Sequence, residues 1–127
     1  MIRVAITDDN PKILITLRLL LSLAKDMEIV CESHNGQEAI DCAKTLQPDV
    51  LVMDIHMPVL DGFTATKKIT KLPVCTRVIL ISLDIENATA ARAAAVGAQG
   101  FIPKDDVAKQ LLPAIETVSQ GETFFVE

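Results

Sequence analysis

Short aliphatic runs alternate with longer segments of helical periodicity along the whole chain. The runs are Ile2 to Thr7, Glu28 to Ser33, Val50 to Met53, Arg77 to Ser82 and Gln99 to Ile102. Short runs that consist mainly of Ile, Leu and Val favour strands buried on both faces. Between them, apolar residues recur at the spacing of one helix face. The pattern predicts strands alternating with helices, five of each.

Capping and breaking residues predict where the helices begin. Asn10 followed by Pro11 suits an N-cap and a first helical position, and Asn35 with Glu38 has the spacing of a capping box. The predicted helices begin after Asn10, after Asn35, near Asp61, near Glu86 and after Asp106. Short connections between alternating strands and helices predict a single α/β domain over residues 1–127, a doubly wound parallel sheet with helices on both faces.

Composition narrows the classes of function. Hydrophobic residues make up 50% of the chain but aromatic residues only 3%, so the core must be aliphatic. The net charge of −5 argues against binding of the nucleic-acid phosphate backbone by this domain alone. Cys31, Cys42 and Cys75 lack the paired spacing of zinc or redox motifs, and we expect reduced core thiols. No apolar run approaches a membrane span, so we expect a cytoplasmic protein with no membrane partner.

Charged and hydroxyl residues stand where the predicted strands end. Asp8 and Asp9 follow the first strand, Asp54 ends the third, Ser82 ends the fourth and Lys104 follows the fifth. The carboxyl ends of parallel strands share one edge of a sheet, so these groups should converge. Three converging carboxylates repel each other unless a cation lies among them. Their oxygen chemistry favours magnesium.

A carboxylate, a hard divalent cation and a lysine are the parts that phosphoryl transfer requires. The metal and Lys104 would neutralise the equatorial oxygens while Asp54 attacks in line. The sequence therefore predicts that Asp54 is a nucleophile that accepts a phosphoryl group.

This arrangement resembles the receiver domains of bacterial two-component response regulators over essentially the whole chain. The matching residues are Asp8-Asp9, Asp54 with Met57-Pro58 and Gly62, Ser82, Gly97 to Phe101, and Lys104. The resemblance implies a flavodoxin-like sheet of strand order 2-1-3-4-5. It also implies that a sensor histidine kinase or a small donor phosphorylates Asp54, and that the domain is not a turnover enzyme on external substrates.

The resemblance also implies roles around the metal and the phosphoryl group. Asp9, Asp54 and the backbone carbonyl of His56 would bind Mg²⁺ directly, and Asp8 mostly through water. Lys104 would stabilise the phosphoryl oxygens.

A switch is implied in the same way. The Ser82 hydroxyl would move towards a phosphoryl oxygen, and Phe101 would turn into the vacated space. The surface of the fourth helix, fifth strand and fifth helix would change, with homodimerisation through that surface as one outcome. Leu83, bulkier than the small residue usual in relatives, is expected to restrict access to Asp54.

The end of the chain resembles the subfamily that carries a LuxR-type helix-turn-helix. Residues 121–127 are expected to begin a linker to an output domain outside these 127 residues. DNA would be contacted only through that output domain, and the regulated process would be transcription.

Three other functions compete with this interpretation. A magnesium-dependent aspartyl phosphatase wants an acid two residues after the nucleophile, where this chain has His56. A flavodoxin-like protein needs an uncharged phosphate loop after the first strand, where this chain has Asp8 and Asp9. A static receiver is disfavoured because every acceptor-site group is present.

Taken alone, Asp8-Asp9 could merely complement a helix dipole.

Overall fold

The chain, in a computed structural model, forms the predicted alternation of strands and helices. The structure describes residues 1–84 and 89–126. In chain order the elements are β1 (Ile2–Thr7), α1 (Pro11–Ser22), β2 (Met27–Ser33), α2 (Gly36–Leu46), β3 (Val50–Asp54), α3 (Gly62–Thr70), β4 (Arg77–Ser82), α4 (Ala90–Ala95), β5 (Gly100–Pro103), the 3-10 turn η1 (Lys104–Asp106), α5 (Val107–Ser119) and β6 (Phe124–Phe125). The predicted start of the fourth helix near Glu86 lies outside the described residues.

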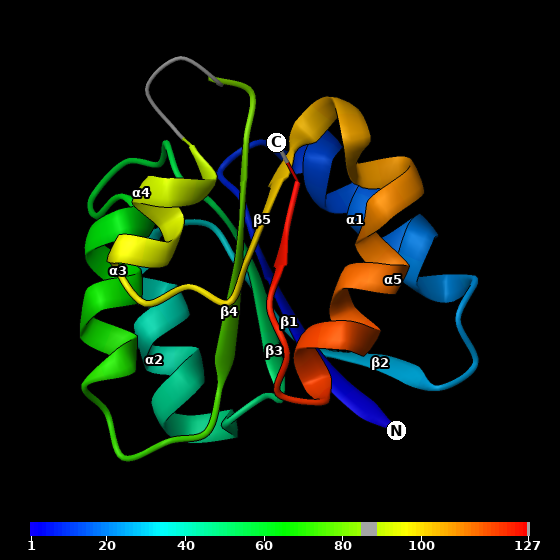
Figure 1. Cartoon of the computed structure of the whole chain (residues 1–127). Coiled ribbons are helices and arrows are strands. Elements are labelled where there is room, and N and C mark those ends of the chain that lie inside the picture. The colour runs from blue at the N-terminus through cyan, green and yellow to red at the C-terminus, as the bar shows by residue number, and fades with distance from the viewer. Residues whose placement is uncertain (85–88, 127) are drawn as a thin grey trace.

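The strands form one parallel sheet in the order β2-β1-β3-β4-β5-β6. Helices α2, α3 and α4 cover one face, and α1 and α5 cover the other (Figure 1). The predicted order 2-1-3-4-5 is confirmed. The chain passes from β1 to β2 on one side and then to β3 on the other, so the carboxyl ends of β1 and β3 are neighbours at a topological switch point.

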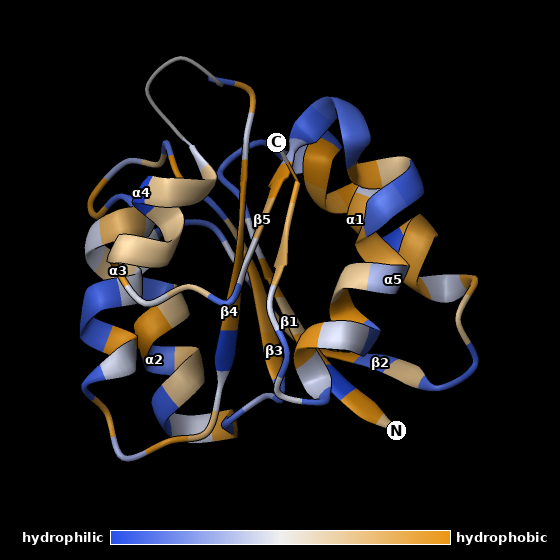
Figure 2. Cartoon of the chain, viewed as in Figure 1, coloured by the Kyte–Doolittle hydropathy of each residue, from blue (hydrophilic) through white to orange (hydrophobic). Residues whose placement is uncertain are grey.

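Two aliphatic clusters, one on each face of the sheet, form the core. All of β3 is buried, which explains its unbroken apolar sequence. Alternate residues of β3 serve opposite faces: Met53 joins the cluster under α2, α3 and α4, whereas Val52 joins the cluster under α1 and α5. Hydrophobic residues are accordingly concentrated in the central strands and on the inward helix faces (Figure 2).

Within the described residues the sheet has six strands rather than the predicted five. Gly121, with φ of +92°, ends α5, and the chain then turns back along β5. Phe124 and Phe125, which we expected to belong to a linker, pair with Gly100 and Phe101. A two-residue strand with apolar residues on both faces is too short to leave an alternating pattern.

The predicted N-caps Asn10 and Asn35 are confirmed, and Asp61, predicted only as the approximate start of a helix, is also an N-cap. The side chains of Asn10, Asn35 and Asp61 accept hydrogen bonds from the backbone N–H groups of the first helical turns. The prediction of three core cysteines is wrong for Cys75, which is exposed, whereas Cys42 is buried.

Leu17→Ala should lower the free energy of unfolding by about 2–5 kcal/mol, because Leu17 is fully buried between α1 and the sheet and truncation leaves a cavity. Urea unfolding followed by circular dichroism measures this loss. Leu19→Ala, on the same helix at a position 64% exposed, is the matched control and should change the stability by less than about 0.5 kcal/mol. Equal losses in the two variants would contradict the packing described.

Candidate functional site

Three carboxylates meet where β1 and β3 end. Asp8 is fully buried, Asp54 is 4% exposed and Asp9 faces solvent. Each offers one carboxylate oxygen, and the three oxygens lie within 4.8 Å of one another. Oxygen donors at this spacing are the ligands that a hard divalent cation prefers. The convergence predicted from the sequence is therefore present.

Lys104 brings a positive charge into the same site. Its Nζ lies 2.9 Å from Asp8 Oδ2 and 3.4 Å from Asp54 Oδ1, and the lysine side chain is only 10% exposed. Asp8 Oδ2 makes no hydrogen bond within the described part of the chain, so the ammonium contact is an ion pair of imperfect hydrogen-bond geometry. Strand β5 ends just before Lys104, so the sheet order places this charge against Asp54.

The Asp54 carboxyl is electrostatically strained. Burial raises its pKa above the ordinary value of 3.8, and the nearby charge of Asp8 raises it further. Lys104 and the backbone N–H of His56 lower the pKa but do not cancel the increase. A positive charge added at this site would therefore be strongly favoured.

The loop after Asp54 is tightly folded against the site. A Cβ on Gly62 would overlap the carbonyl oxygen of Asp54, so only glycine lets α3 begin at this point. The Leu60 N–H donates to the Pro58 carbonyl over 2.7 Å, and Val59 between them has φ of +69°. The expected metal contact of the His56 carbonyl stays a prediction.

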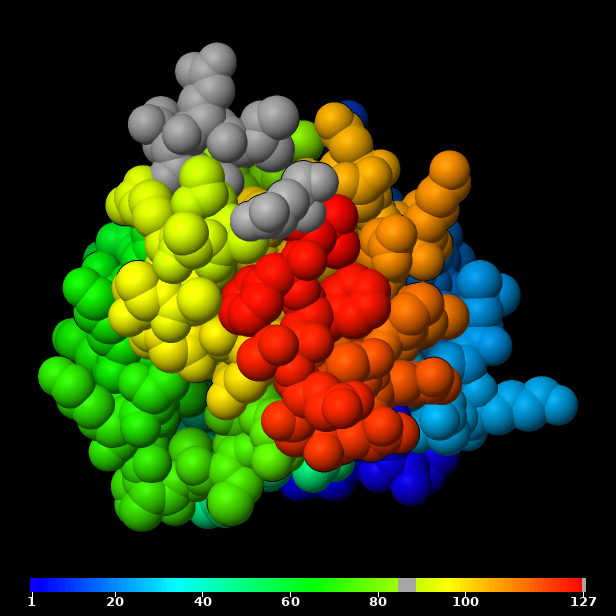
Figure 3. All heavy atoms as spheres, in the orientation of Figure 1, coloured from blue at the N-terminus to red at the C-terminus, as the bar shows by residue number. Residues whose placement is uncertain are grey.

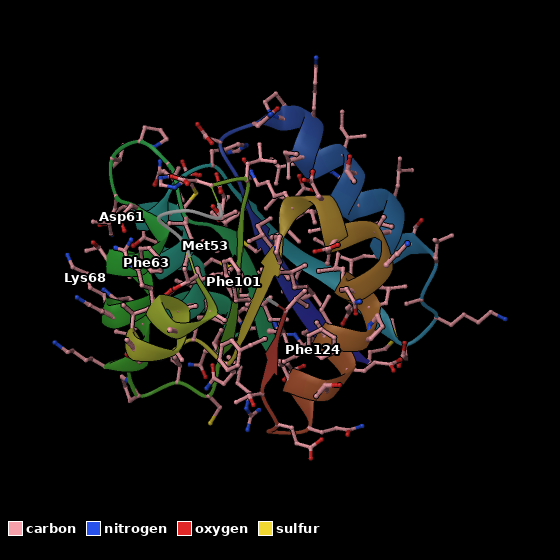
Figure 4. All side chains as sticks on the ribbon, turned by 45° about the horizontal axis from the view of Figure 1, so that its top comes forward. Met53, Asp61, Phe63, Lys68, Phe101 and Phe124 are labelled. Atoms are coloured by element: carbon pink, nitrogen blue, oxygen red, sulfur yellow. The ribbon has the colours of Figure 1, made fainter. Side chains whose placement is uncertain are left out.

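The predicted switch residues lie at different depths. The buried Ser82 hydroxyl accepts a hydrogen bond from the Asp84 N–H over 3.0 Å, which holds it towards the loop after β4. Leu83, the next residue, is 67% exposed. Phe101, labelled on β5 in Figure 4, is already buried. It belongs to the cluster that contains Ala90 and Ala93 of α4.

Two contacts between separate elements were missed from the sequence. His56 Nε2 lies 3.6 Å from Asp84 Oδ2, joining the loops after β3 and β4. The Arg92 guanidinium of α4 lies 4.6 Å from the centroid of the Phe63 ring of α3. Both pairs join residues far apart in the chain, and no spacing rule of a single segment would have found them.

Comparison with known proteins shows the family of this chain. The family model described as the response regulator receiver domain matches residues 4–116. The chain belongs to the response-regulator receiver family. The receiver is 37% identical over 121 residues to the transcriptional regulatory protein LnrK of Bacillus subtilis, an overlap that covers 95% of this chain and 55% of LnrK.

Solved structures also resemble the receiver. The signal receiver domain of the response regulator NarL from Mycobacterium tuberculosis has a TM-score of 0.89 and 31% identity, covering 95% of this chain and 98% of that one. A LuxR-family two-component response regulator from Aurantimonas has a TM-score of 0.87 and 26% identity, covering 96% and 87%. These relatives support the predicted LuxR-type subfamily.

The receiver matches only part of its curated relatives. It spans 55% of LnrK and 57% of NarL from Escherichia coli, so about half the length of each lies outside the match. In the portion of the chain with described coordinates, no helix combines the length and apolar character needed to cross a membrane.

Asp54→Asn should raise the stability of the metal-free receiver near pH 7 but not near pH 4. The raised pKa means that folded Asp54 holds a proton more tightly than the unfolded chain does, so stability falls as the pH rises above 3.8 through the folded pKa. Asparagine cannot ionise and escapes this loss. Urea unfolding in chelator at both pH values measures the difference, with the exposed Asp26→Asn as control. A variant less stable than wild type near pH 7 would disprove the assigned strain.

Proposed function

We propose that the receiver accepts a phosphoryl group on Asp54 from the phosphohistidine of a sensor histidine kinase and thereby controls an output, most simply transcription. The observation that carries this proposal is the convergence of Asp8, Asp9, Asp54 and Lys104 at one edge of the sheet. We propose that this phosphoryl transfer takes place in the cytoplasm.

The chain's own residues account for the transfer. A carboxylate oxygen of Asp54 forms a bond to phosphorus as the P–N bond of the phosphohistidine breaks, and the electron pair of that bond stays with the leaving imidazole. The Lys104 ammonium, 3.4 Å from Asp54 Oδ1, stabilises charge on the phosphoryl oxygens. Hydrolysis of the resulting acyl phosphate returns Asp54 to its carboxylate and ends the signal, and the proposed role of the domain is this signal rather than turnover of an external substrate.

The donor set fits a bound Mg²⁺. Asp9 and Asp54 would hold the ion directly with the His56 carbonyl, and Asp8 would hold it mostly through water. When bound, the ion supplies positive charge that neutralises the phosphoryl oxygens. Asp8 Oδ2 supports this fit, because it is buried and its only close partner among the described residues is the Lys104 ammonium.

The signal would leave the site through β4 and β5. The Ser82 hydroxyl would exchange its bond to the Asp84 N–H for one to a phosphoryl oxygen, and Phe101 would be held in the inward position that it already has. This change biases a two-state surface made of α4, β5 and α5. DNA would be reached only through an output domain such as those of the LuxR-type relatives.

Acetyl phosphate with Mg²⁺ should add one phosphoryl group to the wild-type receiver, as measured by intact mass. Asp54→Asn should abolish the adduct because the nucleophile is lost, and a chelator should suppress it in the wild type. Asp26→Asn, at an exposed position away from the site, is the matched control and should label normally. An undiminished adduct in Asp54→Asn would show that another residue is the acceptor.

Leu83→Ala should speed labelling by acetyl phosphate, because a bulky exposed side chain directly after Ser82 restricts the approach of a small donor. The initial rate of adduct formation measures the effect. Leu23→Ala removes a leucine of similar exposure at the end of α1 and should leave the rate unchanged. A Leu83→Ala rate equal to that of wild type would remove the proposed role.

A further inference from the structure

The edge of β5 is occupied by the chain's own C-terminal segment, residues 122–126, which we call the strap. The Phe124 N–H donates to the Gln99 carbonyl over 2.9 Å, and the Val126 N–H donates to the Phe101 carbonyl over 2.8 Å. A Cβ on Gly100 would lie only 3.1 Å from the Phe124 carbonyl oxygen, so the glycine admits this close approach. The strap is therefore paired with β5 from Phe124 to Val126 rather than a loose tail.

Side chains of the strap pack against the apolar clusters on both faces of the sheet. Phe124 and Val126 pack against the cluster under α1 and α5, whereas Phe125 packs against the cluster under α2, α3 and α4. The C-terminal residues fill the seam between α4 and α5 on the surface (Figure 3). The expected dimer face of α4, β5 and α5 is thus covered along its middle, and a second copy can pair with β5 only after the strap has left.

Phe125 is the register partner of Phe101. Partners in adjacent parallel strands point to the same face, and both rings belong to the cluster on the α4 side. A Phe101 ring that swung out of the core beside β5 would meet the space that Phe125 fills. A docked strap therefore favours the inward position of Phe101.

We propose that the β5 edge is a docking site for the strap and that docking is coupled to phosphorylation of Asp54 through Phe101 and Phe125. This inference rests on the proposed function. The strap stabilises the inward Phe101 that phosphorylation requires. By thermodynamic reciprocity, phosphorylation strengthens strap docking by the same factor. The strap is then the part of the receiver that carries the state of Asp54 to whatever follows residue 126.

Hydrogen exchange on the full chain tests this coupling. Mg²⁺ with beryllium fluoride, a stable mimic of the phosphoryl group, should slow exchange of the Phe124 and Val126 amides about fivefold or more. Phe125→Ala should abolish this slowing of amide exchange. It should also raise the beryllium fluoride concentration at half saturation by the same factor by which exchange slows in the wild type. Phe124→Ala removes an equal ring from the other face of the strap. It should speed exchange overall yet keep the response.

Each contrary result overturns a different statement. If acetyl phosphate labels Asp54 by intact mass while strap exchange ignores beryllium fluoride, the coupling is wrong and the proposed function stands. If Phe125→Ala keeps the full response, the route through Phe101 and Phe125 is wrong. If Asp54 takes up neither probe, the proposed function fails and the coupling falls with it.

Discussion

The ammonium group of Lys104 lies between two carboxylates that water scarcely reaches, and the arrangement of the sheet serves this contact. Asp8 and Asp54 are nearly or fully buried, and like charges at such depth are costly unless a counter-charge joins them. Burial and the charge of Asp8 raise the pKa of Asp54, so additional positive charge beside these carboxylates would stabilise the site. The buried carboxylates therefore reduce the stability of the receiver at the position of its proposed chemistry.

The topology explains how residues so far apart in sequence reach one place. Strands β1 and β3 are neighbours although β2 lies between them in the chain, so Asp8 and Asp54 end side by side. Strand β5 is two positions from β3, and the long lysine stem spans β4. Gly62 lets the following loop fold down on the Asp54 carbonyl. A rigid aliphatic core on both faces fixes these positions.

The sequence predicted the features that arise from repeated local rules. Aliphatic runs indicated the first five strands, Asn10 and Asn35 were recognisable caps, and the shared edge of parallel strands brought Asp54 and Lys104 together. The sequence did not predict the orientation of side chains. The Ser82 hydroxyl accepts a hydrogen bond from the Asp84 backbone N–H, and the His56 ring lies near the Asp84 carboxylate. Both contacts depend on the geometry of loops, which the periodicity of a sequence does not encode. The strand β6 was missed because its two residues form a strand only against β5.

The two ends of the sheet are protected in different ways. Strand β2 forms one end, and its exposed Glu28 and Glu32 discourage a foreign strand by charge. Strand β5 carries no charged side chain and is shielded instead by β6. A fusion protein or a shortened chain that ends before Glu122 would expose the edge of β5, which is uncharged and flanked by the apolar surface that the strap covers. Such an edge can pair with strands of other molecules, so we expect filaments or precipitation. Boundaries for expression are therefore best drawn beyond Val126.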